Sequence, residues 1–435
     1  MRVPHGHPSN GFCPALRNRN RPPYASRVPG PFRVALALLF ASSLIAADLA
    51  LVGGTVYVSP GAAPVGNGVI VVHDGVISAV GPRGSVPVPP GARVLDCAGK
   101  FIFAGFWNSH VHILTPALLH ARDASAADLD RELDGMLNRW GFTTVFDVAS
   151  VLANTVALRD RIERGDVRGP HILTTGEPLW TEPPVYVRDF LNANHIRMGV
   201  VTTPGEAAVR VREEAGGGAD GIKLFTGSAQ ERHVANMPLE IARAAVTEAH
   251  RLRLPVFAHP QNLQGLQVAI ESGVDILAHT APESPPWTPE FVATLKGARM
   301  ALIPTLTLFD FEARKAGAPG AERQAWIDKM VRELRAFSGG GGEVLFGTDV
   351  GYIDHFDTAL EFTLMSHGGM SFEQILAALT TNPAGRFGRG DRSGRIAKGL
   401  DADLTVLQGD PAQDVTAFSR VRFTIRSGVV TFSAP

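Results

Sequence analysis

The pattern of apolar and polar positions divides the chain into a long central region and two flanking regions. Between about residues 101 and 390, eight short apolar runs alternate with amphipathic or alanine-rich stretches such as 126–139, 203–215 and 238–253. Alternating strands and helices are typical of parallel α/β folds, and eight such repeats predict a (β/α)8 TIM barrel. The predicted strands are 101–112, 143–148, 171–176, 221–225, 255–259, 276–280, 301–306 and 344–349.

The flanking regions contain short apolar runs separated by glycine turns, with no amphipathic stretch between them. Residues 48–100 include a predicted hairpin with Asp74-Gly75 as its turn, and residues 391–435 again read as strands around glycine turns. Residues 48–99 carry no catalytic grouping. The simplest interpretation is that both chain ends pair into one small β-sandwich domain beside the central barrel at 101–390.

The first 47 residues predict export. Residues 34–47 are uncharged and apolar, which is the length of a signal-peptide core and short of the roughly 18 residues expected of a membrane-spanning helix. Cleavage near Ala46 and Ala47 would give a periplasmic or secreted protein with no membrane contact in its mature form; an uncleaved N-terminal anchor is the alternative. Cys13 lies in the removable part and leaves Cys97 alone, so the mature chain has no intrachain disulfide.

Composition adds a restriction on partners. The 435 residues are 45% hydrophobic and 19% charged, as in ordinary globular proteins. Residues 1–47 hold six Arg and no Lys, Asp or Glu, so their removal takes the net charge from −1 to −7. Such a surface gives no electrostatic reason to expect nucleic acid or an anionic membrane as partner. A small-molecule substrate is therefore expected, and a homo-oligomer stays open because barrels of this kind often associate.

Side chains that can bind metal stand at the C-terminal ends of the predicted strands. His110 and His112 are two residues apart at the end of the first strand, so their imidazoles share one face. Neutral imidazole is a good zinc ligand, but one pair fills at most half of a tetrahedral site. The carboxyl ends of barrel strands converge, so the remaining ligands are expected from other strands. The candidates there are Lys223, His259, His279 and Asp349.

These motifs, in this order, resemble the amidohydrolase superfamily of metal-dependent hydrolases, over nearly the whole mature chain. The resemblance implies two divalent metal ions, with zinc expected. His110 and His112 would bind the more buried ion and His259 and His279 the more exposed one. Lys223 would bridge both ions as its CO2-derived carbamate, and Asp349 would be the last ligand and the proton shuttle.

The chemistry explains each residue type. An ammonium group has no lone pair for a metal, so Lys223 can bind only when neutral or carbamylated. Two ions roughly 3.5–4 Å apart lower the pKa of a bridging water and polarise the substrate carbonyl. Hydroxide then attacks, and Asp349 accepts the proton and delivers it to the leaving nitrogen. The structural alternative for Lys223 is a buried ion pair with Asp349.

The residues after His259 favour one branch of this superfamily. Mononuclear members that act on rings carry a glutamate shortly after this histidine, whereas here Pro260-Gln261-Asn262 follow. Together with Lys223, this favours an amidohydrolase that cleaves the amide of a dipeptide or N-acyl amino acid, similar to prolidase-like members. The alternatives are imidazolonepropionase-like or deaminase-like hydrolysis of a cyclic C–N bond, hydrolysis of a lactone, and a non-catalytic barrel that binds metal or ligand.

Substrate-binding residues are sought in the loops after the strands. Either of two loop arginines could clamp a substrate carboxylate bidentately, a tyrosine offers aromatic surface, and two histidines could donate to the carbonyl oxygen. These candidates are Tyr186, Arg188, Arg232, His233 and His355. His171 begins the third predicted strand, at the opposite end of the barrel, and is predicted to be structural.

Overall fold

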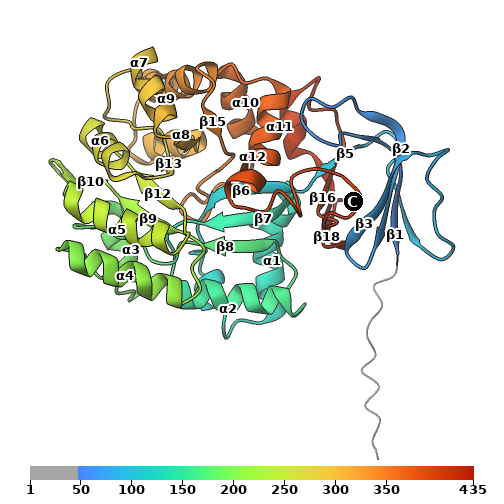
Figure 1. Cartoon of the computed structure of the whole chain (residues 1–435), viewed down its shortest axis with the longest axis horizontal. Coiled ribbons are helices and arrows are strands. Elements are labelled where there is room, and N and C mark those ends of the chain that lie inside the picture. The colour runs from blue at the N-terminus through green and yellow to red at the C-terminus, as the bar shows by residue number, and fades with distance from the viewer. Residues whose placement is uncertain (1–47) are drawn as a thin grey trace, which may run out of the picture. The chain divides into compact units, whose positions relative to one another are not determined.

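The structure, a computed structural model, describes residues 48–435 (Figure 1). The predicted signal segment therefore lies outside the described residues, and export stays a prediction. Within residues 48–435, no helix combines the length and the apolar character that crossing a membrane requires.

Strands from both chain ends form one mixed eight-stranded sheet, in the order β18-β17-β16-β5-β1-β2-β3 with β4 beside β1 (Figure 1). The join between the ends is β5, which runs parallel to β1 and antiparallel to β16. The prediction that the two ends pair is therefore confirmed. The bounds are β1 Leu49–Val56, β2 Val65–His73, β3 Val76–Pro82, β4 Arg93–Asp96, β5 Phe101–Ala104, β16 Leu404–Leu407, β17 Val421–Arg426 and β18 Val429–Ser433.

Alternation along β1 explains why this sheet is stable. Leu49 and Leu51 point into one buried apolar cluster, whereas Ala50 and Val52 point into another on the opposite face. Successive side chains of a strand point to opposite faces, so a strand that is apolar at every position must be covered on both sides. All four residues are less than 9% exposed.

The parallel strands form two sheets that hydrogen bonds connect at both edges. The three-stranded sheet is β6-β7-β8, and the five-stranded sheet is β15-β14-β13-β12-β9. The amide of Leu179 donates to the carbonyl of Lys223, and the amide of Ser109 donates to the carbonyl of Phe346. The arrangement is TIM-barrel-like. The bounds are β6 Phe106–Val111, β7 Phe142–Asp147, β8 His171–Thr174, β9 Ile222–Phe225, β12 Val256–His259, β13 Ile276–Ala278, β14 Ala301–Ile303 and β15 Glu343–Val344.

Helices lie around the outside of the parallel strands (Figure 1). They bury their apolar faces against the strands in one large cluster that includes Leu133, Leu158 and Val246. A small hairpin of β10 (Gly227–Ala229) and β11 (Val234–Asn236) follows β9. The helices are α1 Ala126–Met136, α2 Leu152–Glu163, α3 Val185–Ala193, α4 Pro204–Gly216, α5 Leu239–Arg251, α6 Leu263–Ser272, α7 Pro289–Gly297, α8 Leu306–Lys315, α9 Gly320–Gly339, α10 Ala359–His367, α11 Phe372–Leu379 and α12 Thr381–Arg386.

The predicted first strand, 101–112, is two strands in different sheets. β5 pairs in the mixed sheet and β6 pairs with β7, so the chain changes sheets at Gly105. Only glycine fits there, because a Cβ on Gly105 would lie 2.1 Å from the hydroxyl of Thr143. The prediction of a single strand over 101–112 was therefore wrong, although the placement of His110 and His112 does not depend on it.

The predicted last strand, 344–349, is also shorter than expected. Only β15 has ladder pairing. Beyond it, the amide of Asp349 donates to the carbonyl of His110, and the backbone of Asp349 is left-handed with φ 65°. The turn that points Asp349 into the site interrupts the regular strand.

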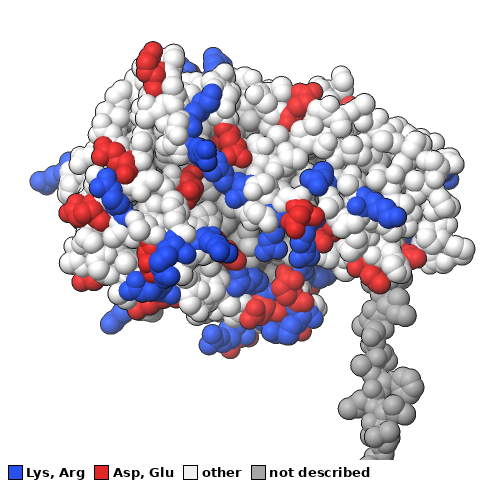
Figure 2. Space-filling view, viewed as in Figure 1, with Lys and Arg blue, Asp and Glu red and all other residues white. Residues whose placement is uncertain are grey.

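Positive and negative side chains are interleaved on the face shown in Figure 2, over the helices as well as near the mixed sheet. Ion pairs link some of the charged side chains of residues 48–435, such as Arg159 and Asp220 at 2.7 Å.

Candidate active site

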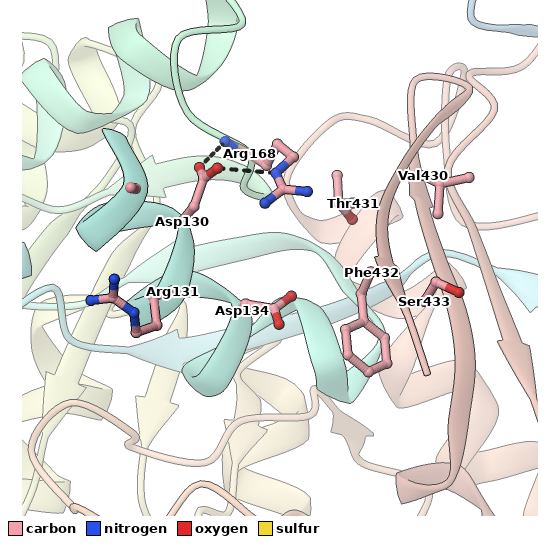
Figure 3. Close-up of a pocket in the computed structure, with 9 residues that line it drawn as sticks. Asp130, Arg131, Asp134, Arg168, Val430, Thr431, Phe432 and Ser433 are labelled. Atoms are coloured by element: carbon pink, nitrogen blue, oxygen red, sulfur yellow. Dashed lines mark hydrogen bonds and ion pairs between the residues drawn. The ribbon is translucent and has the colours of Figure 1, made fainter. Parts of the chain in front are cut away.

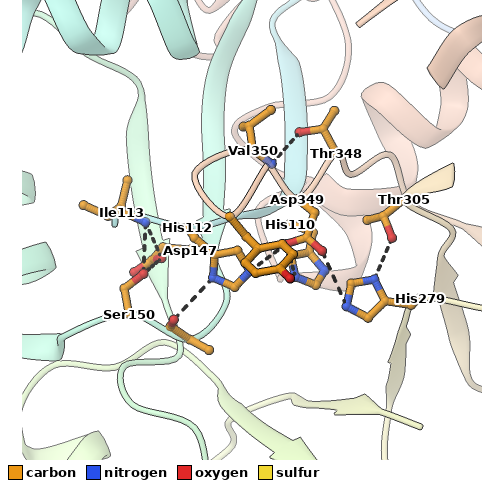
Figure 4. A network of polar contacts seen from close by, with 12 residues as sticks. His110, His112, Ile113, Asp147, Ser150, His279, Thr305, Thr348, Asp349 and Val350 are labelled. Carbon is orange, nitrogen blue, oxygen red and sulfur yellow. Dashed lines mark hydrogen bonds and ion pairs between the residues drawn. The ribbon is translucent and has the colours of Figure 1, made fainter. Parts of the chain in front are cut away.

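The six predicted metal ligands come together at the C-terminal ends of the parallel strands. All six line a single cavity of about 720 Å³: His110, His112, Lys223, His259, His279 and Asp349. The ring centroid of His110 lies 5.2 Å from that of His112 and 4.6 Å from that of His279. The ring centroids of His259 and His279 are 4.9 Å apart. Strand ends far apart in the sequence thus place these imidazoles side by side, and Figure 4 shows three of them around Asp349.

Asp349 is at the centre of this group. Its Oδ1 lies 2.7 Å from Nε2 of His112 and 3.5 Å from Nε2 of His110, and its Oδ2 lies 3.8 Å from Nε2 of His279. Oδ1 is buried and makes no hydrogen bond. A carboxylate that faces three ring nitrogens through its two oxygens, one of them without a hydrogen bond, has the environment of a metal ligand.

Hydrogen bonds fix the outer nitrogen of three imidazoles. Nδ1 of His112 lies 3.3 Å from the carbonyl of Ala149, and Nδ1 of His279 lies 2.6 Å from the hydroxyl of Thr305. Nε2 of His259 lies 3.2 Å from Oε1 of Gln261, and its ring stacks on Phe225. Such bonds orient metal-binding imidazoles and set their tautomer.

The buried polar atoms of the site fit a divalent cation. Both ring nitrogens of His110 are buried without a hydrogen-bond partner. One ligand atom from each of His110, His279 and Asp349 lies within 4.8 Å of the others. Burial, followed by the charge of Lys223, lowers the pKa of His259 to about 3, and burial lowers the pKa of His110 and His279 well below the usual range. These imidazoles are therefore neutral, which is the form that binds metal.

Lys223 lies in β9 and is only 1% exposed. Burial lowers the pKa of its ammonium group to about 7, although the nearby Asp349 acts in the opposite direction. Among residues 48–435, no carboxylate forms an ion pair with Nζ, so the predicted structural alternative, an ion pair with Asp349, is absent. Nζ instead lies 5.5 Å from the ring centre of Phe225.

Comparison with known proteins supports the assignment that this geometry suggests. The amidohydrolase family profile matches residues 101–431. The chain belongs to the amidohydrolase family. It is therefore a hydrolase that acts on carbon–nitrogen bonds, and the candidate metal site agrees with a family that uses divalent metal ions.

Three relatives illustrate the similarity of this amidohydrolase to known proteins. Ochratoxinase of Aspergillus niger is 23% identical over 394 residues, which cover 82% of this chain and 80% of that protein. A candidate prolidase from Bifidobacterium longum is 26% identical, with a TM-score of 0.75 over 89% of this chain and 95% of that one. A Xaa-Pro dipeptidase structure with bound methionine has a TM-score of 0.76 and 22% identity, over 89% of this chain and 100% of that one.

The walls of the amidohydrolase cavity are mainly aromatic and aliphatic. Helix α3 covers one side with Phe190 and Leu191, which pack with Trp180 and Phe225 in a separate apolar cluster. Helix α8 contributes Phe309. The aromatic residues that line the cavity are Trp180, Tyr186, Phe190, Phe225, Phe309, Trp326, Tyr352 and Phe356. Large apolar surface with a few polar groups is typical of small-molecule sites.

The predicted substrate-binding residues separate into two groups. Tyr186 lines the cavity, and its ring centre lies 5.5 Å from that of Tyr352. Arg188, on α3, and the exposed residues Arg232, His233 and His355 are not among the residues that line it. The structure thus brings Tyr186 to the cavity that holds the predicted metal ligands and leaves the other four outside the cavity wall.

Several residues of the site were not predicted from the sequence. Gln261 contacts His259 and donates to Glu283 at 2.8 Å, and Thr305 contacts His279. Lys315 lines the cavity with its Nζ 3.4 Å from the hydroxyl of Tyr352. Of these, only Gln261 had a signal in the sequence, because it stands two residues after His259, where the mononuclear members differ.

A second cavity, of about 460 Å³, lies between α1 and β18 and has a different character (Figure 3). Its wall is polar, and Arg168 pairs with Asp130 at 3.0 Å across it. None of the predicted site residues lines it.

Proposed function

We propose that this amidohydrolase cleaves the amide bond of a dipeptide or N-acyl amino acid with the help of two divalent metal ions, with zinc expected. The observation that carries the proposal is the convergence of four imidazoles, Lys223 and Asp349 in one apolar cavity, where burial keeps the imidazoles of His110, His259 and His279 neutral. The prolidase-like and ochratoxinase relatives support an amide as substrate.

The ligand roles follow from the resemblance and from the local contacts. His110 and His112 would hold one ion, and His259 and His279 the other. Lys223 would hold both as its carbamate. Its burial and its lack of an ion pair support this role, because a neutral amine can react with CO2 and a carbamate in contact with cations would compensate the cost of burial.

The chain's own residues account for the movement of the proton. Bound divalent ions supply an acidified water and polarise the substrate carbonyl. Asp349 faces the site with an oxygen that makes no hydrogen bond, so it can accept the proton of the attacking water. The same carboxyl can then donate the proton to the leaving nitrogen. Tyr186, whose pKa is raised by burial and by the nearby Asp349, stays a neutral phenol beside it.

The cavity wall favours substrates with a large apolar or aromatic group. Its aromatic side chains offer stacking surface on several sides, and a charged side chain of the substrate would lose hydration there. Lys315 lines the cavity and can bind a carboxylate of the substrate. Arg188 and Arg232 are the alternatives, and their side chains would have to reach into the cavity from outside its wall. We therefore expect N-acyl derivatives of apolar amino acids to be better substrates than polar ones.

The proposed architecture has two domains. Residues 101–390 form a closed (β/α)8 barrel, and both chain ends, residues 48–100 and 391–435, form a β-sandwich. The hydrogen bonds at both edges of the parallel sheets support closure. The two apolar clusters on opposite faces of β1 support the sandwich. Because β5 pairs in the mixed sheet, we place the boundary between the N-terminal part of the β-sandwich and the barrel at Gly105.

Elemental analysis of residues 48–435, purified without chelator, tests the two-metal site. Two equivalents of metal per chain, with turnover of N-acyl amino acids and dipeptides, are expected. Matched substrates with a free or an amidated carboxyl group then test the need for a carboxylate. Two equivalents without turnover on a broad amide panel would instead favour a protein that only binds metal or ligand.

A single-metal enzyme acting on a cyclic C–N bond is the second candidate. It is favoured by the compact group of His110, His279 and Asp349, which resembles a site for one ion. One equivalent of metal per chain, and turnover of cyclic amides but not of N-acyl amino acids, would establish it in place of the first candidate.

A further inference from the structure

The junction between β14 and α8 has an unusual conformation at one residue. Thr305 is the N-cap of α8, yet its backbone is left-handed, with φ 44° and ψ 53°. β-Branched residues rarely adopt this conformation, because the Cβ substituents crowd the backbone. Such a conformation persists only where surrounding contacts hold it, and it is often found at functional sites.

The hydroxyl group of Thr305 explains what the conformation achieves. Oγ1 lies 2.6 Å from Nδ1 of His279 (Figure 4). The same hydroxyl donates to the carbonyl of Pro304 at 2.9 Å. A hydroxyl has one hydrogen to donate, and here Pro304 accepts it. With the hydroxyl hydrogen on Pro304, the bond to His279 is donated by the imidazole. In this arrangement Nδ1 of His279 carries the proton, and the lone pair is on Nε2, which lies 3.8 Å from Oδ2 of Asp349.

This use of the hydroxyl leaves the N-terminus of α8 without its usual cap. An N-cap threonine ordinarily accepts from a backbone amide of the first turn, but Thr305 makes no such bond. The buried carboxylate of Glu361, on α10, takes its place. It accepts from the amide of Leu306 at 2.9 Å and from the amide and hydroxyl of Thr307 at 2.7 and 2.6 Å.

We propose that Thr305 and Glu361 are positioning residues that hold His279 in one tautomer, with Nε2 free for a metal ion. Glu361 caps α8 and so releases the hydroxyl of Thr305 for His279. The inference rests on the proposed function in one respect, the role of His279 as a metal ligand. The tautomer itself is a property of the metal-free chain.

The alternative is that Glu361 only stabilises the fold. Glu214 provides a comparison, because it is also buried and accepts from a backbone amide, that of Glu177 at 3.2 Å. Its contacts do not lead to any predicted metal ligand. If Glu361 were only structural, the two glutamates would have equivalent effects on the imidazole of His279.

The experiment compares Thr305→Val, Thr305→Ser and Glu361→Gln with two controls. Val keeps the shape and the β-branching of Thr but lacks the hydroxyl, whereas Ser keeps the hydroxyl. Thr424→Val removes another buried hydroxyl, which donates to the carbonyl of Asn138 at 2.6 Å in the mixed sheet, and Glu214→Gln is the control for Glu361→Gln. Circular dichroism and melting temperature verify the fold of each variant.

Two readouts are measured. The first is the 15N NMR spectrum of the metal-free protein with labelled histidine, in which nitrogen shifts report the tautomer; the His279 signals are assigned with His279→Gln. The second is the dissociation constant for Co²⁺. Thr305→Val should shift the His279 signals toward a tautomer mixture and weaken Co²⁺ binding by about 10- to 100-fold, the usual range for groups that orient metal ligands. Glu361→Gln should act in the same direction, whereas Thr305→Ser and both controls should resemble the original protein.

Unchanged His279 signals in both Thr305→Val and Glu361→Gln would overturn the proposal. Equal effects of Glu361→Gln and Glu214→Gln would overturn the role of Glu361. If the original protein binds no Co²⁺, the proposed function fails, and the tautomer measurement alone decides the role of Thr305.

Discussion

Oδ1 of Asp349 lies 2.7 Å from Nε2 of His112. This contact connects the segment after β15, the last parallel strand, with the end of β6, the first. The carboxylate makes no hydrogen bond through that oxygen. It is therefore placed both to bind metal and to exchange a proton with a reacting group. Substitutions that separate these two roles test the proposed chemistry directly.

Asp349→Asn should retain much of the metal and lose turnover by a factor of about 10² or more, because an amide can neither accept nor deliver the proton. Turnover of the best N-acyl amino acid and elemental analysis of the same sample measure the two effects. Asp391→Asn, at an exposed position, is the matched control. Turnover equal to that of the original protein would exclude Asp349 as the proton shuttle.

Lys223→Ala should disorganise the binding of both ions, since the proposed carbamate would be lost from the centre of the site. Short carboxylates such as acetate or propionate should restore part of the activity, because they can occupy the space of the missing side chain and supply two oxygens. Metal content and turnover are measured with and without added carboxylate. Full activity without any addition would remove the carbamate from the mechanism.

The position of the candidate metal ligands could be predicted because it follows from the chain's periodicity. Each apolar run ends where a buried strand reaches the mouth of the barrel, so His259 and His279 could be placed there without knowledge of any contact. This rule depends on where a strand ends and not on its length. His110 and His112 therefore lie at the end of β6 as expected, although 101–112 is divided into two strands at Gly105.

The residues around those ligands could not be predicted in this way. Glu361 is far in sequence from the start of α8 and reaches the amides of Leu306 and Thr307 only through the packing of α8 on α10, which leaves no periodic signal. Helix α3 was also missed, because Tyr186 and Arg188 were assigned to a loop after the third predicted strand, whereas both lie in this helix. Arg188 and Arg232 were chosen for their chemistry alone, and loop arginines can point in many directions.

Phe418→Ala should destabilise the protein by about 3–5 kcal/mol, the usual cost of deleting a fully buried aromatic side chain. Phe418 is 0% exposed, and its ring centre lies 5.0 Å from Phe362 and 5.8 Å from Phe106. It thereby packs the C-terminal region against α10 and β6. Urea unfolding measures the change. Val429→Ala, at a side chain that is 55% exposed, should change stability by less than about 0.5 kcal/mol.

A loss for Phe418→Ala no larger than that for Val429→Ala would show that the C-terminal region contributes little to the stability of the core. Phe418→Leu should lie between the two, because it refills part of the cavity.

The stability of the end of the parallel strands opposite the candidate active site should depend on pH through His171. Its Nδ1 lies 3.2 Å from Glu163 and its Nε2 lies 3.5 Å from Asp403. Burial lowers the pKa of His171, but these carboxylates outweigh it and raise the pKa above 6.5. The stabilisation from His171 is therefore complete below pH 6.5 and is lost as the pH rises through the raised value.

Glu163 has the opposite dependence. Its hydrogen bond with His171, together with the charge of Arg426, lowers its pKa from 4.5 to about 2 in spite of partial burial. Its contribution is present above pH 4.5 and is lost as the pH falls toward 2. The cluster should thus stabilise the protein most between pH 4.5 and 6.5.

Glu163→Gln tests this window by melting temperature across pH 3–9. The difference from the original protein should be largest between pH 4.5 and 6.5 and should shrink on both sides. Because the side chain of Glu163 is 49% exposed, solvent screens the pair and the shift should not exceed about 2 °C. Asp166→Asn, which breaks the exposed pair with Arg164, is the control and should show no such window. A difference that is constant with pH would mean that Glu163 contributes through packing, because only a change in proton binding can make the difference depend on pH.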